Sequence, residues 1–180
     1  MEYHNPVLLK ETVDGLNIHP DGVYVDVTFG GGGHSREIMS RLGENGKLFA
    51  FDQDLDALNN AIDDERFTLI NENFRFIKRF LRFHGIKQVD GIFADLGVSS
   101  HQFDVAERGF STRFDAELDM RMNQKGDISA YHVVNEYDEQ DIARVLFDYG
   151  ELKNARAMAN VIVTARKDKE IKNSDELKRV

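Results

Sequence analysis

Apolar runs alternate with amphipathic segments over the first hundred residues of this chain. Four short apolar runs predict buried strands, at residues 23–29, 47–52, 67–71 and 89–96. Between them, apolar positions recur at helical spacing in three segments, at residues 34–42, 55–62 and 74–85, the last closed by Gly85. Strands that alternate with helices over short connections form right-handed crossovers, so the sequence predicts an α/β fold with a parallel sheet and helices on both faces.

The pattern changes after residue 104, where no further apolar strand follows. Residues 137–151 and 154–167 have apolar positions three and four residues apart, in the first case at Ile142, Val145, Leu146 and Tyr149. Another helix is expected to begin at Ser174, with Ser174 as its N-cap and acidic residues in the first turn. We therefore predict two domains, an α/β core over residues 1–104 and a helical unit over residues 105–180.

The number of predicted strands is small for a nucleotide-binding sheet. A doubly wound sheet normally has more strands on the far side of its first one. We therefore expect the parallel sheet to be incomplete in this chain. A sheet edge left open in this way is also a surface on which two copies could pair as a homodimer.

The composition narrows the class of protein further. The absence of cysteine among the 180 residues excludes a disulfide framework, a thiolate nucleophile and a cysteine metal site. Residues 1–15 mix charged and polar side chains, so no signal peptide is predicted, and no apolar window approaches ~18 residues, so no membrane segment is predicted. The absence of cysteine also favours a reducing cytosol, so we expect a cytoplasmic protein. The net charge of -9 argues against a dedicated nonspecific nucleic-acid binder, although a local basic face could still contact phosphates.

Four consecutive glycines, Gly30 to Gly33, separate the first predicted strand from the first predicted helix. At that place a backbone without side chains lets a ligand approach the helix N-terminus closely. Asp52 ends the second predicted strand, 22 residues after Gly30 (52 minus 30), where an acid can accept both ribose hydroxyls of an adenosine-containing ligand. The two features together predict a nucleoside-binding site.

Three ligands compete for this site. A phosphate-loop nucleotide site would need a lysine next to the glycines, which is absent. A dinucleotide site for NAD prefers GxGxxG, and Ser35 occupies the position of its last glycine. S-adenosylmethionine is favoured, because its loop resembles an acid followed by alternating small residues, here Asp26, Thr28, Gly30 and Gly32. A glycine turn without a ligand is the remaining alternative, and it would leave Asp52 unexplained.

The segment after the fourth predicted strand offers polar side chains for a second reactant. The first and fourth strands flank the point where the strand order reverses, so the crevice beside the ligand should be lined by Asp95, Ser99, Ser100 and Gln102. Amino-methylating enzymes commonly hold Asn or Asp there, followed by two prolines and an aromatic residue. Only Asp95 matches, so these residues alone leave the acceptor atom open, and Asp95 could also simply cap a turn.

Other polar residues give weaker indications. His4, Asn5 and Pro6 precede the core and could form a lid, but their spacing favours a cap for a helix that begins near Pro6. A metal pair from His34 and His101 lacks the usual spacing, so no metal site is predicted. The serines after the fourth strand lie in no GxSxG turn.

Residues 74–87 interleave cations with aromatic rings. The cations are Arg75, Lys78, Arg79, Arg82 and Lys87, and the rings are Phe74, Phe76, Phe80 and Phe83. This pattern could form a helix that contacts phosphates and stacks on bases, but the helical spacing favours rings that face the sheet and cations that face water. Phe74 is a separate case, because it follows the third strand, where its ring could stack on an adenine.

Seven segments together resemble the RsmH, or MraW, family of bacterial methyltransferases. They are HNPVLL (4–9), DVTFGGGGHS (26–35), FDQD (51–54), NFRFI (73–77), ADLGVSSHQFD (94–104), ERGFS (107–111) and LDMRM (118–122). The resemblance implies an S-adenosylmethionine-dependent enzyme that methylates N4 of a cytidine in the decoding region of 16S rRNA, with the small ribosomal subunit as its partner. It also implies a Rossmann-like class I methyltransferase core with a helical insertion unit for substrate recognition.

The resemblance also assigns roles to single residues. Gly32, Gly33 and His34 would contact the methionine part of the cofactor, Asp52 its ribose, Phe74 its adenine, and Asp95 with Gln102 the rest of the pocket. Candidates for orienting the target amine are Asp95, Ser99, His4 and Asn5. Family members continue well past residue 180, so the resemblance implies a truncated member. The alternative function is therefore a fragment that binds S-adenosylmethionine without catalysis.

Overall fold

The computed structural model describes residues 6–180 and divides the chain into two compact units. The first unit ends at Val98 and also takes in Met122–Gln124, and the second comprises Ser99–Arg121 and Lys125–Val180. The observed division thus precedes α4 (Ser100–Asp104), whereas the sequence placed it after this helix. The reason is that α4 is tied to the chain that follows it, since the Arg113 guanidinium donates to the Phe103 carbonyl and the Asp104 carboxylate.

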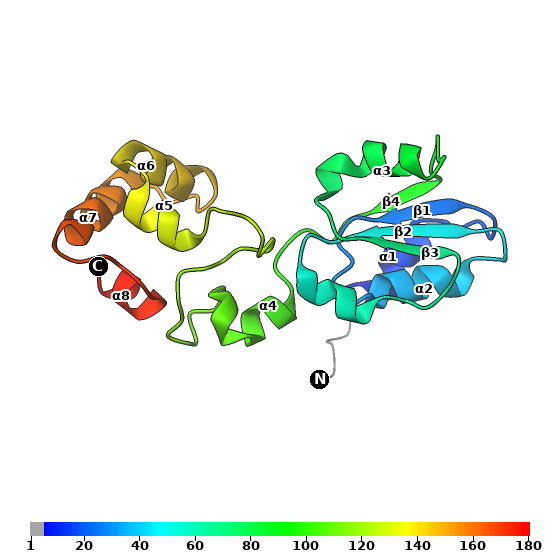
Figure 1. Ribbon diagram of the computed structural model, residues 1–180, viewed down its shortest axis with the longest axis horizontal. Coiled ribbons are helices and arrows are strands. Elements are labelled where there is room, and N and C mark those ends of the chain that lie inside the picture. Colours follow the sequence, from blue (N-terminus) through cyan, green and yellow to red (C-terminus); the bar gives the residue numbers. More distant parts are fainter. Residues whose placement is uncertain (1–5) are drawn as a thin grey trace. The chain divides into compact units, whose positions relative to one another are not determined.

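A four-stranded parallel sheet in the order β3-β2-β1-β4 forms the centre of the first unit (Figure 1). Its strands are β1 (Val23–Asp26), β2 (Lys47–Phe51), β3 (Phe67–Ile70) and β4 (Gly91–Phe93). The predicted α/β class, the parallel pairing and the position of the first strand beside the fourth are confirmed. Each strand is shorter than the apolar run that predicted it, because the burial of a segment does not end where its strand pairing ends. Val27 and Phe29, for example, are buried but lie past the end of β1.

Helices cover both faces of this sheet (Figure 1). On one face, α1 (Leu9–Gly15) and α2 (Gly33–Arg41) pack on a core of Val13, Tyr24, Ile38, Met39, Leu42 and Leu48. On the other, α3 (Ile77–Phe83) packs on a core of Val25, Val27, Phe49, Phe51, Ile70 and Leu81. Successive residues of a strand point to opposite faces, so β1 and β2 each supply both cores.

Two segments predicted as ordinary helices differ in the structure. Residues 55–62 form only a short 3-10 helix, η1 (Leu55–Asn60), whose N-cap Asp54 accepts from the Asp56 N–H. The segment that begins at Phe74 opens as a 3-10 turn, η2 (Phe74–Phe76), before it continues as α3. The expected stop at Gly85 is confirmed, because Gly85 has a φ of 75°, in the left-handed region that favours glycine.

The prediction that the rings of this segment face the sheet is wrong for Phe83. Ile77, Phe80 and Leu81 pack on the sheet, whereas the side chain of Phe83 is 83% exposed. Successive helical residues turn by about 100°, so a ring two positions after the buried Leu81 lies on the far side of α3. The five cations of the segment are exposed, as expected.

The second unit is helical, as the sequence predicts. It contains α4, η3 (Ala106–Arg108), α5 (Ala130–Glu136), α6 (Glu139–Asp148), α7 (Ala155–Asp168) and α8 (Ser174–Arg179). Its core consists of Leu118, Val134, Ile142, Ala159, Ile162 and Ile171. Tyr149 lies just beyond the end of α6 and is 86% exposed, so the predicted apolar stripe stops before it.

The helix α8 begins at Ser174, as the sequence predicts, but its cap is a different residue. Asn173, not Ser174, is the N-cap, since its Oδ1 accepts from the Glu176 N–H at 2.8 Å. The Ser174 hydroxyl instead donates to the Phe114 carbonyl. Across the chain from residue 6 onward, none of the helices is both long and apolar enough to cross a bilayer.

Candidate functional site

The glycine run forms the turn between β1 and α2. Gly30 and Gly32 have φ values of 50° and 75°, and Gly32 is the N-cap of α2. This left-handed conformation costs an L-residue with a side chain roughly 1–2 kcal/mol. The two glycines therefore allow the chain to leave the sheet sharply and bring the first-turn N–H groups of α2, which have no partner within the helix, to the end of β1.

The absence of side chains at these glycines has two different consequences. A Cβ on Gly32 would lie 2.8 Å from the Phe29 ring, and a Cβ on Gly33 would lie 2.2 Å from Cγ of Pro6. Within residues 6–180, a Cβ on Gly30 would have no neighbour closer than 4.0 Å. The room beside Gly32 and Gly33 is thus filled by the protein itself, and only Gly30 of these three borders open space that a ligand could enter.

Gly32→Ala is expected to lower the free energy of unfolding by about 1–3 kcal/mol, because the new methyl group would occupy a left-handed position and overlap Phe29. The measurement is urea unfolding of both chains. Gly15→Ala is the control, since a Cβ there meets nothing within 4 Å among the described residues, and its free energy of unfolding should change by no more than about 1 kcal/mol. Equal losses at both positions would contradict the prediction.

Asp26, at the end of β1, holds this turn from inside the protein. Its side chain is 1% exposed and accepts from the Ser35 hydroxyl at 2.7 Å and from the Thr28 N–H at 3.0 Å. Burial raises the pKa of the Asp26 carboxyl above its ordinary value, and the hydrogen bonds from Ser35 and Thr28 oppose that rise. Asp26 therefore links β1 to the first turn of α2 and does not reach a ligand.

Asp52 follows β2 and also supports the glycine turn. Its two carboxylate oxygens accept from the Gly30 N–H at 2.7 Å and from the Asp54 N–H at 2.9 Å. The carboxylate is half-buried, and burial raises its pKa, against the effect of these backbone N–H groups. Each carboxylate oxygen can accept a second hydrogen bond, so the geometry fits a carboxylate that also accepts from a ribose diol.

Phe74, the ring expected at the adenine, opens η2 and is 42% exposed. The preceding Asn73 caps this turn through the Arg75 N–H, and its Nδ2 donates to Oε1 of Gln53 at 3.0 Å. Gln53 follows Asp52 directly, so this hydrogen bond connects the acid expected at the ribose to the turn that carries Phe74. Sequence reasoning missed both Asn73 and Gln53, which lie inside the quoted NFRFI and FDQD segments.

The segment Met122–Gln124 also belongs to this first unit. Nε2 of Gln53 lies 3.8 Å from Sδ of Met122, and Nε2 of Gln124 donates to the Asp54 carboxylate at 3.4 Å. These contacts place three residues from a distant part of the sequence beside the loop that follows β2. The only indication in the sequence was that the quoted LDMRM segment ends at Met122.

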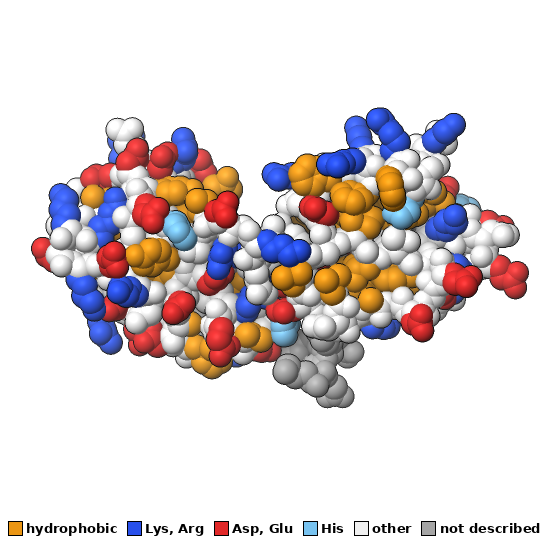
Figure 2. Space-filling model, viewed as in Figure 1, with side chains coloured by type: hydrophobic (Ala, Val, Ile, Leu, Met, Phe, Trp, Pro, Cys, Tyr) orange, Lys and Arg blue, Asp and Glu red, His pale blue; other side chains and the backbone are white. Residues whose placement is uncertain are grey.

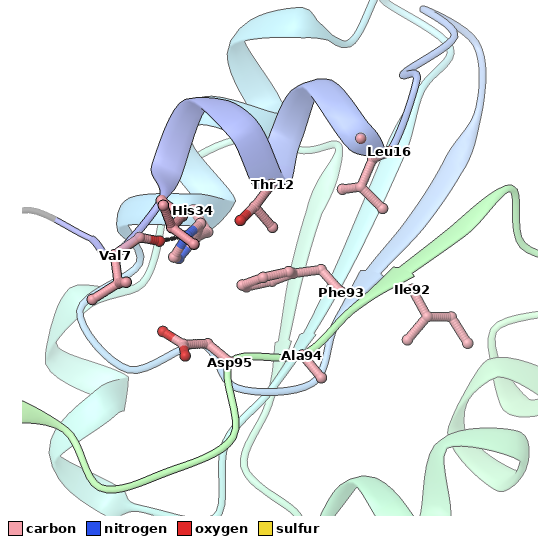
Figure 3. Close-up of a pocket in the computed structure, with 10 residues that line it drawn as sticks. Val7, Thr12, Leu16, His34, Ile92, Phe93, Ala94 and Asp95 are labelled. Carbon is pink, nitrogen blue, oxygen red and sulfur yellow. Dashed lines mark hydrogen bonds between the residues drawn. The ribbon is translucent and has the colours of Figure 1, made fainter.

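A pocket of ≈ 360 Å³ lies between α1, the start of α2 and the end of β4 (Figure 3). It is lined by Val7, Leu8, Thr12, Gly15, Leu16, His34, Ile92, Phe93, Ala94 and Asp95. His34 is buried here, with Nε2 donating to the Val7 carbonyl at 3.1 Å and its ring centre 4.4 Å from that of Phe93. Apolar side chains such as Leu16 and Phe93 thus share the wall of the pocket with polar ones, and His34 and Asp95 lie at one end.

Asp95 extends from the end of β4 towards Val7 and His34 (Figure 3). Its backbone N–H donates to Oγ1 of Thr28 at 2.7 Å, which fixes it beside the segment that follows β1. Within residues 6–180 its carboxylate has no hydrogen-bond or ion-pair partner, so the interpretation of Asp95 as a turn cap is not supported. The acid is available to a ligand.

The N-terminal segment contradicts the predicted helix cap. The helix α1 begins at Leu9, and its N-cap Leu8 makes no side-chain cap hydrogen bond. Pro6 instead lies against Gly33, and Val7 accepts from His34, so this segment lines the glycine turn. His4 and Asn5 lie outside the described residues, and their roles remain predictions.

Ser99 and Gln102 lie in the second unit, where they cap α4. The Ser99 hydroxyl accepts from the Gln102 N–H at 3.2 Å, and Gln102 Oε1 accepts from the Ser99 N–H at 3.0 Å. This reciprocal pair explains both residues within α4 itself. Their expected place beside the ligand remains a prediction.

The remaining predicted site residues lie in the first unit. The glycine turn follows β1, Asp52 follows β2 and Asp95 follows β4, at the carboxyl ends of neighbouring parallel strands. Ligands of open α/β sheets bind at this end, where the strand order reverses. The turn, the half-buried acid and the exposed ring of Phe74 together fit a nucleoside cofactor.

Comparisons with known proteins give a consistent result. Residues 1–180 match the model of the MraW methylase family. The chain is 79% identical over 180 residues to ribosomal RNA small subunit methyltransferase H of Flavobacterium johnsoniae, covering 100% of this chain and 60% of that protein. The protein of the same name from Flavobacterium psychrophilum is 71% identical over 173 residues, which cover 96% of this chain and 60% of that protein. The one from Christiangramia forsetii is 67% identical over 177 residues, which cover 98% of this chain and 59% of that protein. The chain thus spans about 60% of the length of these curated relatives.

Proposed function

The chain belongs to the MraW methylase family, and on that premise we propose that it transfers a methyl group from S-adenosylmethionine to N4 of a cytidine in the decoding region of 16S rRNA. One observation carries the proposal: the glycine turn, Asp52 and Asp95, whose carboxylate has no partner among the described residues, follow neighbouring strands at one end of the sheet. The names of the relatives support small-subunit rRNA as the substrate.

The proposed cofactor contacts follow the shape of this site. The N–H groups of the first turn of α2, at Gly33 and His34, are suited to the carboxylate of the methionine part. Because the space beside Gly32 and Gly33 is filled, these glycines act through their backbone. Asp52 accepts from the ribose hydroxyls, and the exposed ring of Phe74 stacks on the adenine.

The proposed reaction is an in-line displacement on a methyl group. When bound, S-adenosylmethionine supplies an electrophilic methyl carbon on a positively charged sulfur. Cytosine N4 is a weak nucleophile, because its lone pair is delocalised into the ring. Asp95 accepts a hydrogen bond from the N4 amine, which localises the lone pair and aligns the nitrogen with the methyl carbon. The same carboxylate can accept the proton that the methylated amine releases.

Binding of S-adenosylmethionine without catalysis is the second candidate function. It is favoured by one observation, that the chain spans about 60% of the length of the relatives. Residues needed for rRNA binding or catalysis in those proteins can therefore fall outside this chain.

The proposed enzyme would act in the cytoplasm, where ribosomal subunits are found. The outer edge of β4, at the end of the sheet, offers a pairing surface for a homodimer.

A combined binding and transfer experiment tests the proposal. S-adenosylmethionine is titrated into the chain by calorimetry, then unmethylated small ribosomal subunits are added and the digested 16S rRNA is analysed by mass spectrometry. Binding with formation of N4-methylcytidine is the expected result. Binding without transfer would assign the second candidate function, and no binding by a folded chain would overturn both.

A further inference from the structure

The segment from Asn73 to Val89 is basic, although the chain as a whole is acidic. It contains five Lys or Arg residues and no Asp or Glu, although the net charge of the chain is -9. All five cations are exposed, and Lys and Arg side chains gather over α3 in Figure 2. We call the surface formed by Arg75, Lys78, Arg79, Arg82 and Phe83 the α3 basic face.

The cations of the α3 basic face repel one another. They occupy positions i, i+3, i+4 and i+7, so they project from one side of the helix and its preceding turn. Like charges at these spacings destabilise a helix. Arg41, for comparison, pairs with Asp14 and Glu37, whereas no acidic side chain within residues 6–180 pairs with the cations of the α3 basic face. A polyanion would relieve this repulsion.

An exposed ring accompanies the charges. Phe83 is 83% exposed and follows Arg82 directly, and its edge-to-face neighbour is His84, with ring centres 5.3 Å apart. Core packing therefore does not account for this ring. Exposed aromatic rings beside cations are the usual combination for single-stranded RNA, because the rings stack on bases while the cations hold phosphates.

We propose that the α3 basic face is a docking surface for RNA, with the four cations on phosphates and Phe83 against an unpaired base. The inference rests on the proposed function, because the RNA would be that of the small ribosomal subunit. None of the five residues belongs to the cofactor site, so docking and cofactor binding can be measured separately.

The test compares two double variants that remove the same charge. Lys78→Gln with Arg82→Gln changes the α3 basic face, and Lys10→Gln with Lys47→Gln changes exposed lysines on α1 and β2. Binding to a 16S rRNA transcript is measured by fluorescence anisotropy at several salt concentrations. The first pair should weaken binding roughly tenfold or more at low salt and reduce the slope of log K against log salt by about 1–2, and the control pair should leave that slope unchanged. Phe83→Ala should weaken binding about fivefold or more.

Each outcome separates docking from catalysis when methyl transfer and S-adenosylmethionine binding are measured on the same samples. Selective loss of RNA binding with normal cofactor affinity supports the α3 basic face, even if the parent chain transfers no methyl group. Equal RNA binding and equal salt slopes for both pairs would overturn it, whereas methyl transfer by the parent would still uphold the proposed function. If the α3 variants instead lose binding to phosphatidylglycerol vesicles and keep RNA binding, the face is a membrane contact and the proposal is also overturned.

Discussion

Asp52→Asn is expected to lower the affinity for S-adenosylmethionine by about 100-fold or more. A carboxylate can accept from both ribose hydroxyls, and each hydrogen bond to a charged group contributes about 1.5–3 kcal/mol. In the parent chain one carboxylate oxygen of Asp52 accepts from the Gly30 N–H and the other from the Asp54 N–H. The amide introduced by Asp52→Asn would have only one acceptor oxygen for these two N–H groups and for the ribose hydroxyls. The substitution therefore removes the acceptors for the diol and loosens the glycine turn together.

Calorimetric titration with S-adenosylmethionine measures this loss. Asp63→Asn is the matched control, because it makes the same chemical change at an exposed acid that follows η1. Circular dichroism and thermal unfolding of each variant separate lost binding from lost structure. A folded Asp52→Asn chain that binds S-adenosylmethionine as tightly as its parent would remove Asp52 from the proposed ribose contact.

Asp95→Ala should reduce methyl transfer by about 10²–10³-fold at saturating cofactor and rRNA. The reason is that alignment of a weak amine nucleophile supplies much of the expected rate, and a methyl side chain at this position would accept no hydrogen bond from the amine. Stability should hardly change, because the Asp95 carboxylate has no partner within residues 6–180 and only its backbone N–H is bonded to Thr28.

Single-turnover transfer to small ribosomal subunits is the appropriate readout, with the cofactor affinity of Asp95→Ala measured separately. That second measurement matters because the family resemblance also places Asp95 beside the cofactor. Glu65→Ala is the control, since it removes an exposed acid between η1 and β3. Turnover close to that of the parent chain would contradict the role proposed for Asp95.

Local patterns in the sequence predicted the elements that depend on local physics. The apolar runs marked all four strands, and the spacing of apolar residues marked α2, α6 and α7. Gly85 marked the end of the α3 segment, because few other residues adopt its left-handed conformation. Two of the errors arise where the helical period continued past the end of the helix, as at Tyr149, or counted a ring on the outer side of the helix, as at Phe83, and both rings are exposed.

The sequence by itself determined the α/β class and the place of a glycine turn and an acid after the first two strands. Only the tertiary structure decided what those residues touch. Phe29 and Pro6 fill the space beside Gly32 and Gly33, and Gln53 meets Met122 across 69 residues of sequence. Periodicity and residue type report local conformation and burial, whereas such contacts depend on the path of the whole chain through space. That path left the Asp95 carboxylate without a partner within residues 6–180 and tied Ser99 to Gln102 in the capping of α4.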